Sequence, residues 1–179
     1  MPRHVRHLGI SLLRIAIVAS IAASLLTMGA TAATPTRPNL WNGAAAGMTI
    51  DQVAAVVPQA KAATGQVLED GSQSGLSAPA ELAGAPAEAV FFFRIKGLSA
   101  VLVEKHAMSS GHGPENLAEA RRIVALATSQ YGRPQSCIDR PELADLDCVW
   151  LSGGIKVAVS YHDLGGGSPA LSILYRPAH

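Results

Sequence analysis

Strict alternation of apolar and polar side chains is the clearest pattern in this chain, and it falls near the C-terminal end. Residues 155–162 read IKVAVSYH, in which every second side chain is large and apolar or aromatic. Alternation with a period of two indicates an antiparallel strand with one buried face. Shorter β-prone runs lie on both sides, at 148–151 and 171–175, separated from it by the glycines of 153–154 and 165–167. The pattern predicts a three-stranded meander.

A second β pattern lies in the middle of the chain. Two runs rich in Phe, Val, Leu and Ile, residues 90–95 and 98–103, are joined by a two-residue link that contains a glycine. This arrangement predicts a β-hairpin, with Phe91, Phe93 and Ile95 on one face. The preceding residues show little periodicity, so there we expect only a short strand near 65–69 and then a loop through two prolines.

An amphipathic helix is predicted over residues 114–131. Its apolar side chains recur at steps of three and four residues: Leu117, Ala120, Val124, Ala127 and Tyr131. Pro114 suits the first position of a helix, and Gly132 suits the position after the last turn.

A shorter helix is predicted to begin at Thr49. Thr49 and Gln52 have the spacing of a capping box, and Met48 and Val53 occupy the positions of a hydrophobic staple. Pro58 ends the helix, because proline cannot continue it. The expected apolar stripe consists of Ile50, Val53, Ala54 and Val57.

The order of these elements predicts an α+β fold, with one or two helices packed on an antiparallel sheet in a single domain, residues 47–179. Both halves of this domain, 47–106 and 114–176, run from a helix through a proline to strands with glycine turns. The segments KGLSAVLVEKH and GGIKVAVSYH also match in their apolar positions. Two degenerate helix-plus-sheet repeats would explain this order, and so would a chance use of the same α/β pattern.

The N-terminal residues have the three parts of a secretory signal peptide. Arg3, Arg6 and Arg14 precede an apolar run, and no acidic residue occurs before Asp51. The small residues of the AxA site end at Ala32, so we predict a signal peptide over residues 1–32, cleaved after about Ala32. Retention as a membrane anchor is the alternative, although serines, a threonine and a glycine interrupt the run before it reaches the ~20 apolar residues of a spanning helix.

The residues after the predicted cleavage site indicate a soluble exported protein. Residues 33–46, rich in Thr, Pro, Ala and Gly, are expected to form a flexible arm. No cysteine follows the signal segment for lipidation, so no stable membrane insertion is expected after cleavage. Loss of the three arginines leaves 11 basic and 13 acidic residues, which makes nucleic acid a poor partner. The two cysteines, Cys137 and Cys148, predict one structural disulfide in an oxidising compartment.

Several side chains are candidates for chemistry or contact. His106, His112 and His162, with the Met108 thioether, could hold a metal such as copper, although surface histidines give the same pattern. Asp145 and Asp147 make the disulfide loop acidic and are expected to face solvent or a partner. Trp41 is expected to pack against the helix at Thr49 or to engage a partner. No nucleophile, phosphate-binding or dinucleotide motif is found, so neither enzymatic activity nor a cofactor is expected.

The run GMTIDQVAAVVP, residues 47–58, resembles the helix start of small bacterial envelope proteins of the BamE (SmpA/OmlA) type. The two-part layout also resembles the architecture of the beta-lactamase-inhibitor protein. The resemblance implies a small α+β domain that works by protein–protein contact, with Gly47, Met48, Thr49 and Val53 in structural positions. We therefore expect an exported, non-enzymatic binding module with an envelope protein as its partner. The alternative is a periplasmic metal-binding protein or hydrolase that uses the three histidines.

Overall fold

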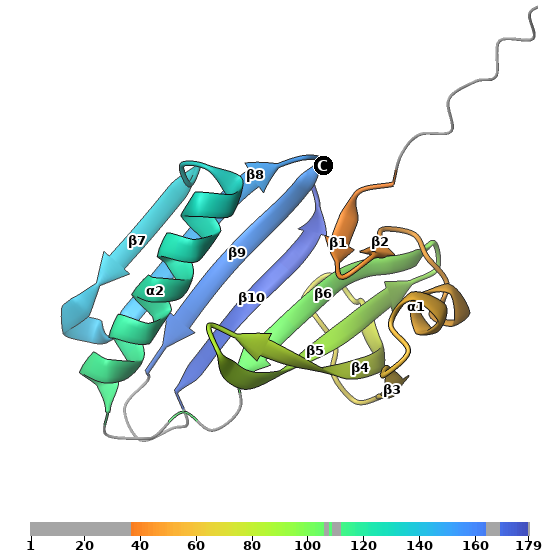
Figure 1. The fold of residues 1–179 in the computed structure, drawn as a ribbon, viewed down its shortest axis with the longest axis horizontal. Helices are drawn as coiled ribbons and strands as arrows, with labels where there is room; N and C mark the ends of the chain where they lie inside the picture. Colours follow the sequence, from red (N-terminus) through yellow and green to blue (C-terminus); the bar gives the residue numbers. More distant parts are fainter. Residues whose placement is uncertain (1–36, 106–107, 109–111, 164–168, 179) are drawn as a thin grey trace, which may run out of the picture. The chain divides into compact units, whose positions relative to one another are not determined.

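An eight-stranded antiparallel sheet is the largest element of the chain (Figure 1). The computed structural model describes residues 37–105, 108, 112–163 and 169–178, so the predicted signal peptide and His106 lie outside the described residues. The strands of the sheet are β3 (Lys61–Ala62), β4 (Gln73–Leu82), β5 (Ala85–Arg94), β6 (Gly97–Lys105), β7 (Ser136–Arg140), β8 (Asp145–Ser152), β9 (Ile155–His162) and β10 (Ala170–Pro177). Their spatial order is β3-β4-β5-β6-β10-β9-β8-β7.

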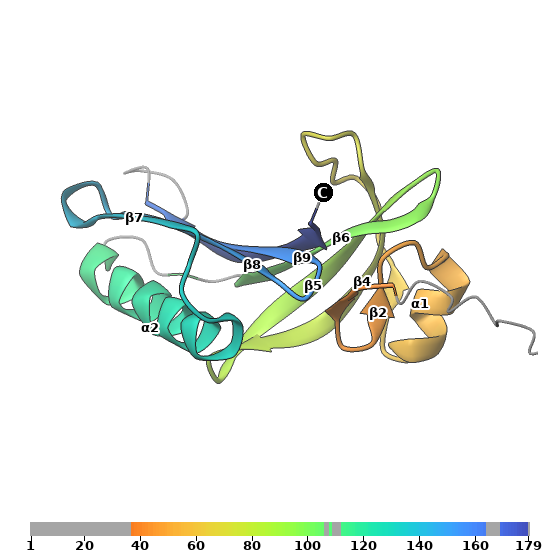
Figure 2. The ribbon, with the colours of Figure 1, turned by 90° about the horizontal axis from the view of Figure 1, so that it is seen from above.

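Two α-helices accompany the sheet, α1 (Ile50–Val56) and α2 (Gly113–Tyr131), and a 3-10 helix, η1 (Pro141–Leu143), joins β7 to β8. Figure 2 shows both α-helices on the same side of the sheet, and residues of both belong to one hydrophobic core. The α+β class and the antiparallel sheet are therefore confirmed. Within the described residues no helix is long and apolar enough to span a bilayer.

The strand order repeats one layout twice. Helix α1 is followed by β3 to β6 and helix α2 by β7 to β10, and the last strand of each series meets the other at the centre of the sheet. In each series the helix contacts the second strand, β4 or β8. By this layout β6 corresponds to β10. The segments 96–106 and 153–162, which match in their apolar positions, instead contain β6 and β9, and these strands occupy different places in the layout.

The core lies between the helices and one face of the sheet. Val157, Val159 and Tyr161 are buried on this face, as the alternation of β9 predicted. Trp150 of β8 is also fully buried, and its Nε1 donates a hydrogen bond to the carbonyl oxygen of Gly132, 3.0 Å away, just after α2. This bond satisfies the only polar atom of the indole inside the core.

The helices follow their predicted boundaries closely. Thr49 and Gln52 form the predicted capping box, with Thr49 Oγ1 accepting from the Gln52 amide and Gln52 Oε1 accepting from the Thr49 amide. In α1 the buried stripe is narrower than expected, because Ile50 is 46% exposed. In α2 the core face includes Ile123, whereas Val124 is only partly buried.

The expectation of a flexible arm to residue 46 is wrong for its described part. Strands β1 (Asn39–Trp41) and β2 (Ala44–Ala45) form a small antiparallel pair. Leu40 and Ala44 are buried in the core, and the Trp41 ring lies edge-on to Phe91 at 5.7 Å between centroids. Trp41 thus packs on Phe91 of β5. Apolar side chains inside a segment of otherwise small residues hold it against the sheet.

The region predicted as a short strand and a loop contains the long strand β4. Residues 65–69 contribute only an isolated bridge, Val67 with Gln73, while β4 pairs with β5 over its whole length. The tight turn at Ala83 and Gly84 uses two residues with positive φ. Pro79 is compatible with β4 because β3 pairs only with Leu76 and Ser77, which leaves the rest of that edge without a second neighbour.

The predicted hairpin is β5–β6, but both faces of β5 are used. Phe91 is buried in the main core, whereas Phe92 is buried on the opposite face with Val90 and Ala100. Ile95 is fully exposed in the turn, so its predicted place on the Phe91 face is wrong. A bulge at Phe92 and Phe93 changes the register just before the turn.

Replacement of Gly97 by alanine is expected to lower the free energy of unfolding by about 3 kcal/mol. The residue has a φ of +100°, and a Cβ there would lie 2.6 Å from the Gly47 carbonyl oxygen. The matched control is Gly65→Ala, where φ is +102° but no atom lies within 4 Å, so only conformational strain of about 1 kcal/mol is expected. Urea denaturation measures the free energy of unfolding of both variants, and an equal decrease in the two would contradict the predicted steric clash at Gly97.

Candidate functional site

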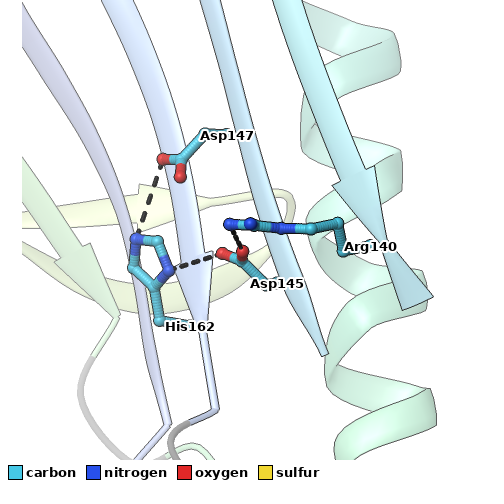
Figure 3. Close-up of polar contacts among 4 residues, drawn as sticks. All are labelled: Arg140, Asp145, Asp147 and His162. Atoms are coloured by element: carbon cyan, nitrogen blue, oxygen red, sulfur yellow. Dashed lines mark hydrogen bonds and ion pairs between the residues drawn. The ribbon is translucent and has the colours of Figure 1, made fainter. Parts of the chain in front are cut away.

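A cluster of four charged or ionisable side chains lies on the sheet face opposite α2 (Figure 3). Arg140 ends β7, Asp145 begins β8, Asp147 follows on the same face, and His162 ends β9. In the register of the sheet Asp145 is paired with Arg140 on one side and with His162 on the other. Three strand ends therefore bring these side chains together, although they are up to 22 positions apart in the sequence.

Asp145 is the centre of the cluster. Its Oδ2 accepts a hydrogen bond from Arg140 Nη2, and its Oδ1 accepts one from His162 Nδ1 at 2.7 Å. The other imidazole nitrogen, His162 Nε2, lies 3.7 Å from Asp147 Oδ1. The imidazole is thus held between two carboxylates, and each nitrogen faces a different one.

Burial differs sharply within the cluster. The Asp145 side chain is 11% exposed, whereas the side chains of Arg140, Asp147 and His162 are 49%, 39% and 43% exposed. Burial acts to raise the pKa of Asp145, but hydrogen bonds and positive charge from Arg140 and His162 outweigh it and lower the pKa below its ordinary value. Asp145 is therefore an ionised carboxylate that holds its two partners while they remain accessible to solvent.

The connection between β7 and β8 positions Arg140 against Asp145. It consists of η1 and of Ala144, whose left-handed conformation at φ +47° turns the chain back. The predicted disulfide joins Cys137 and Cys148, which are directly paired on these two strands. The acidic segment between the cysteines is a β-hairpin closed by η1 rather than a loop. The expectation that Asp145 faces solvent is wrong, because its side chain is buried against its neighbours on β7 and β9.

The predicted site residues separate into different places. Asp145 and Asp147 lie on β8 and meet His162, which joins one predicted metal ligand to the two predicted contact residues. His112 is exposed at the start of α2, and in the described part of the chain no contact joins it to His162. His106 lies outside the described residues, and Trp41 belongs to the β1–β2 pair.

Arg140 was missed by the sequence analysis, as was the meeting of the carboxylates with His162. Alternation along β9 does place His162 on the polar face of its strand. The register between β7, β8 and β9 was needed to identify its neighbours, and a pattern within single strands does not contain that register.

The cluster can act as a charged contact or as a cation site. Arg140 and His162 can donate hydrogen bonds to a ligand, and Asp147 can accept them. One ligand atom from each of Asp145, Asp147 and His162 lies within 4.8 Å of the others, and carboxylate with imidazole is a donor set suited to zinc or manganese. A cation there would have to replace the hydrogen bond between His162 and Asp145.

Comparison with known proteins adds little to this geometry. No protein-family model and no curated protein matches the chain. A crystal structure of a DUF4309 family protein, YjgB from Bacillus subtilis, is similar at a TM-score of 0.39 and 11% sequence identity, over 73% of this chain and 78% of that one. A likeness at this level indicates neither family nor function.

Replacement of Asp145 by asparagine is expected to lower the free energy of unfolding by about 2 kcal/mol at pH 7, because Arg140 and His162 lose a buried ionised acceptor. The folded-state pKa of Asp145 is lowered, so its contribution is complete above the unfolded pKa of about 3.9 and disappears as the pH falls through the folded value. The difference in the free energy of unfolding between wild type and D145N should therefore disappear as the pH falls below the folded-state pKa of Asp145.

The matched control for this test is Asp139→Asn, which removes an exposed ion pair with Arg121. Surface pairs of this kind contribute at most about 1 kcal/mol. Denaturant titrations from pH 7 down to pH 3 compare the two variants, and a D145N loss no larger than that of D139N would contradict the central place of Asp145.

Proposed function

We propose that this chain is an exported, non-enzymatic binding module of the bacterial cell envelope that contacts another protein through the sheet face opposite α2. The observation that carries the proposal is the Arg140–Asp145–Asp147–His162 cluster, which lies on this face beside exposed apolar side chains. The other face of the same strands packs against α2. We call the surface formed by Ile138, Arg140, Asp147, Leu151 and His162, with the buried Asp145 beneath them, the outer face.

The outer face has the mixed character of a protein–protein contact. Ile138 and Leu151 are 53% and 51% exposed, and Ile138 is directly paired with Asp147 across β7 and β8. Accessible apolar side chains next to oriented charges are typical of specific interfaces, where apolar burial supplies affinity and the charges supply specificity. Because Asp145 already holds Arg140 and His162 in place, a partner would lose little side-chain entropy in meeting them.

Two features support the proposed compartment, the N-terminal segment and the disulfide. The three-part signal pattern ending at Ala32 supports export, and a disulfide between Cys137 and Cys148 suits an oxidising compartment. The resemblance of residues 47–58 to BamE-type proteins supports a role in contact with other envelope proteins.

A photo-crosslinking amino acid at Ile138 or Leu151, in cells of the source organism, tests the proposal. We expect one discrete protein adduct from each position, on a chain whose intact mass corresponds to cleavage after about Ala32. The control position is Leu126 of α2, which is 56% exposed on the opposite side. Absence of an adduct from the outer face, or the same adduct from Leu126, would contradict the proposed surface, and a chain of uncleaved mass would contradict export as a cleaved protein.

Divalent-cation binding is a second candidate function. It is favoured by the close approach of Asp145, Asp147 and His162, which could supply two carboxylate oxygens and one imidazole nitrogen. Of the three predicted histidines, His162 belongs to this cluster, His112 does not, and His106 lies outside the described residues. A hydrolytic role would additionally require an activated water or another nucleophile.

Calorimetric titration of the untagged chain with zinc tests this candidate. One equivalent should bind to the wild type, and Asp147→Asn and His162→Ala should each weaken binding about tenfold or more, because each removes one ligand. His112→Ala is the matched control and should leave binding unchanged. Failure to observe stoichiometric binding, or an equal loss in the His112 variant, would eliminate the cluster as a cation site.

A further inference from the structure

We propose that a cleft at the C-terminal end of β10 binds a small organic anion, that is, a carboxylate or phosphate group attached to an apolar body. The cleft lies where the turn between β5 and β6 meets the end of β10, and none of its lining residues belongs to the outer face. Its ligand would be recognised by the basic side chains that line it and by the apolar side chains between them.

The size and walls of the cleft suit a small molecule. It encloses about 1050 Å³ and is open to solvent on one side. This is at the upper end of the volumes of small-molecule sites. Phe93, Leu98 and Pro177 supply apolar wall, which favours a ligand with an apolar portion over a bare inorganic ion.

Positive charge predominates among the lining residues. Arg94, Lys96 and Arg176 line the cleft, and Asp70 is the single acidic residue among those that do. In the described part of the chain Arg94 and Lys96 form no salt bridge. An anion entering the cleft would therefore meet two cations that form no ion pair of their own.

Arg176 has unused hydrogen-bonding capacity. Its Nη1 lies 3.9 Å from Asp70 Oδ2, which is an ion pair but too long for a hydrogen bond, and its Nε is buried without an acceptor. A guanidinium has five N–H donors arranged to bind carboxylate or phosphate in pairs. The part-buried side chain of Arg176 is thus a donor group that lacks a full set of acceptors.

Asp70 neutralises only part of this charge. Hydrogen bonds from the side chain and backbone of Ser72 lower the pKa of Asp70, and the charges of Arg176 and Arg94 lower it further, so the carboxylate is ionised. The Ser72 amide donates to Asp70 Oδ1 at 2.9 Å. Asp70 is thus hydrogen-bonded to Ser72 and lies too far from Arg176 to accept a hydrogen bond from it.

A like-charge pair supports the inference independently. Arg176 of β10 is paired directly with Lys156 of β9, on the same side of the sheet. Like charges in direct cross-strand register destabilise a sheet. A bound anion near Arg176 would relieve that repulsion, and this gives the unfavourable pair a physical reason.

The cleft is formed before any ligand binds. The Gly47 amide donates to the Leu98 carbonyl at 2.8 Å, and the Leu98 amide donates to the Met48 carbonyl at 2.7 Å. These bonds join the start of β6 to the segment before α1, which forms another wall of the cleft. Ser99 Oγ donates to Ser72 Oγ at 2.9 Å, which ties the loop after Asp70 to β6. Walls bonded to one another fix the backbone of the cleft, so less backbone entropy is lost on binding.

The cleft is separate from the charged cluster of the outer face. Lys156, opposite Arg176, is six residues from His162 along β9, a distance of roughly 20 Å in an extended strand. Leu151 of the outer face lies nearer, because it is paired with Lys156 across β8 and β9. Variants of the charged cluster therefore leave the cleft testable, and Ile138 is the crosslinking position farther from it.

Calorimetry on the full purified chain tests the proposal with octyl phosphate, octanoate, octanol and inorganic phosphate, each below any micellar concentration. Octyl phosphate, octanoate or both should bind at one molecule per chain, and the headgroup that binds identifies the anion. Octanol and inorganic phosphate should bind at least tenfold more weakly, since octanol lacks the anionic group and inorganic phosphate lacks the apolar portion. Arg176→Gln and Lys96→Gln should each weaken the anionic probe about tenfold.

Arg122→Gln is the matched control, because Arg122 is an exposed arginine of α2 outside the cleft. Lys96→Gln changes only an exposed turn side chain, so it keeps the test valid if the Arg176 variant is unstable. The proposal is overturned if neither anion gives saturable binding, if octanol binds as tightly as the anions, or if inorganic phosphate matches octyl phosphate. It is overturned equally if Arg122→Gln weakens binding as much as Lys96→Gln.

Discussion

The antiparallel pairing of β6 with β10 is the contact on which the rest of the structure depends. These strands end the two helix-plus-strand series, and their register places Val103 beside Ile173 and Val101 beside Tyr175. Because neighbouring side chains in register share a face, this single pairing aligns the apolar faces of both halves. A slip of one residue would turn the core side chains of one half toward solvent. One hydrophobic core beneath both helices is the result.

The parts of the fold that were predictable are those in which side-chain pattern and secondary structure agree. β9 alternates strictly, and α2 has a regular apolar stripe between Pro114 and Gly132, so local sequence and tertiary packing favour the same elements. β4 is different. Its residues QSGLSAPAEL have weak β-propensity, and the strand forms because β5 pairs with it along its length. Tertiary context supplies there what local preference lacks.

The same distinction applies to the sites. The disulfide was predictable because the chain has two cysteines, which allow a single pairing. The grouping of Arg140, Asp145 and His162 depends on the register of three strands, and the basic cleft depends on a meeting of the β5–β6 turn with the chain end. Both are non-local arrangements of ordinary residue types, so no short motif marks them. Candidate residues could be named from the sequence, but their neighbours could not.

The two edges of the sheet bear on how this chain behaves in a crowded compartment. An open edge invites strands of other molecules to add to it, which leads to aggregation. On one side the edge strand β3 has two residues, and Pro79 interrupts the uncovered donors of β4. On the other side β7 is short, carries the charged side chains Asp139 and Arg140, and is covalently held to β8. Both edges are thus poor templates for strand addition, which favours a protein that remains dispersed at high concentration.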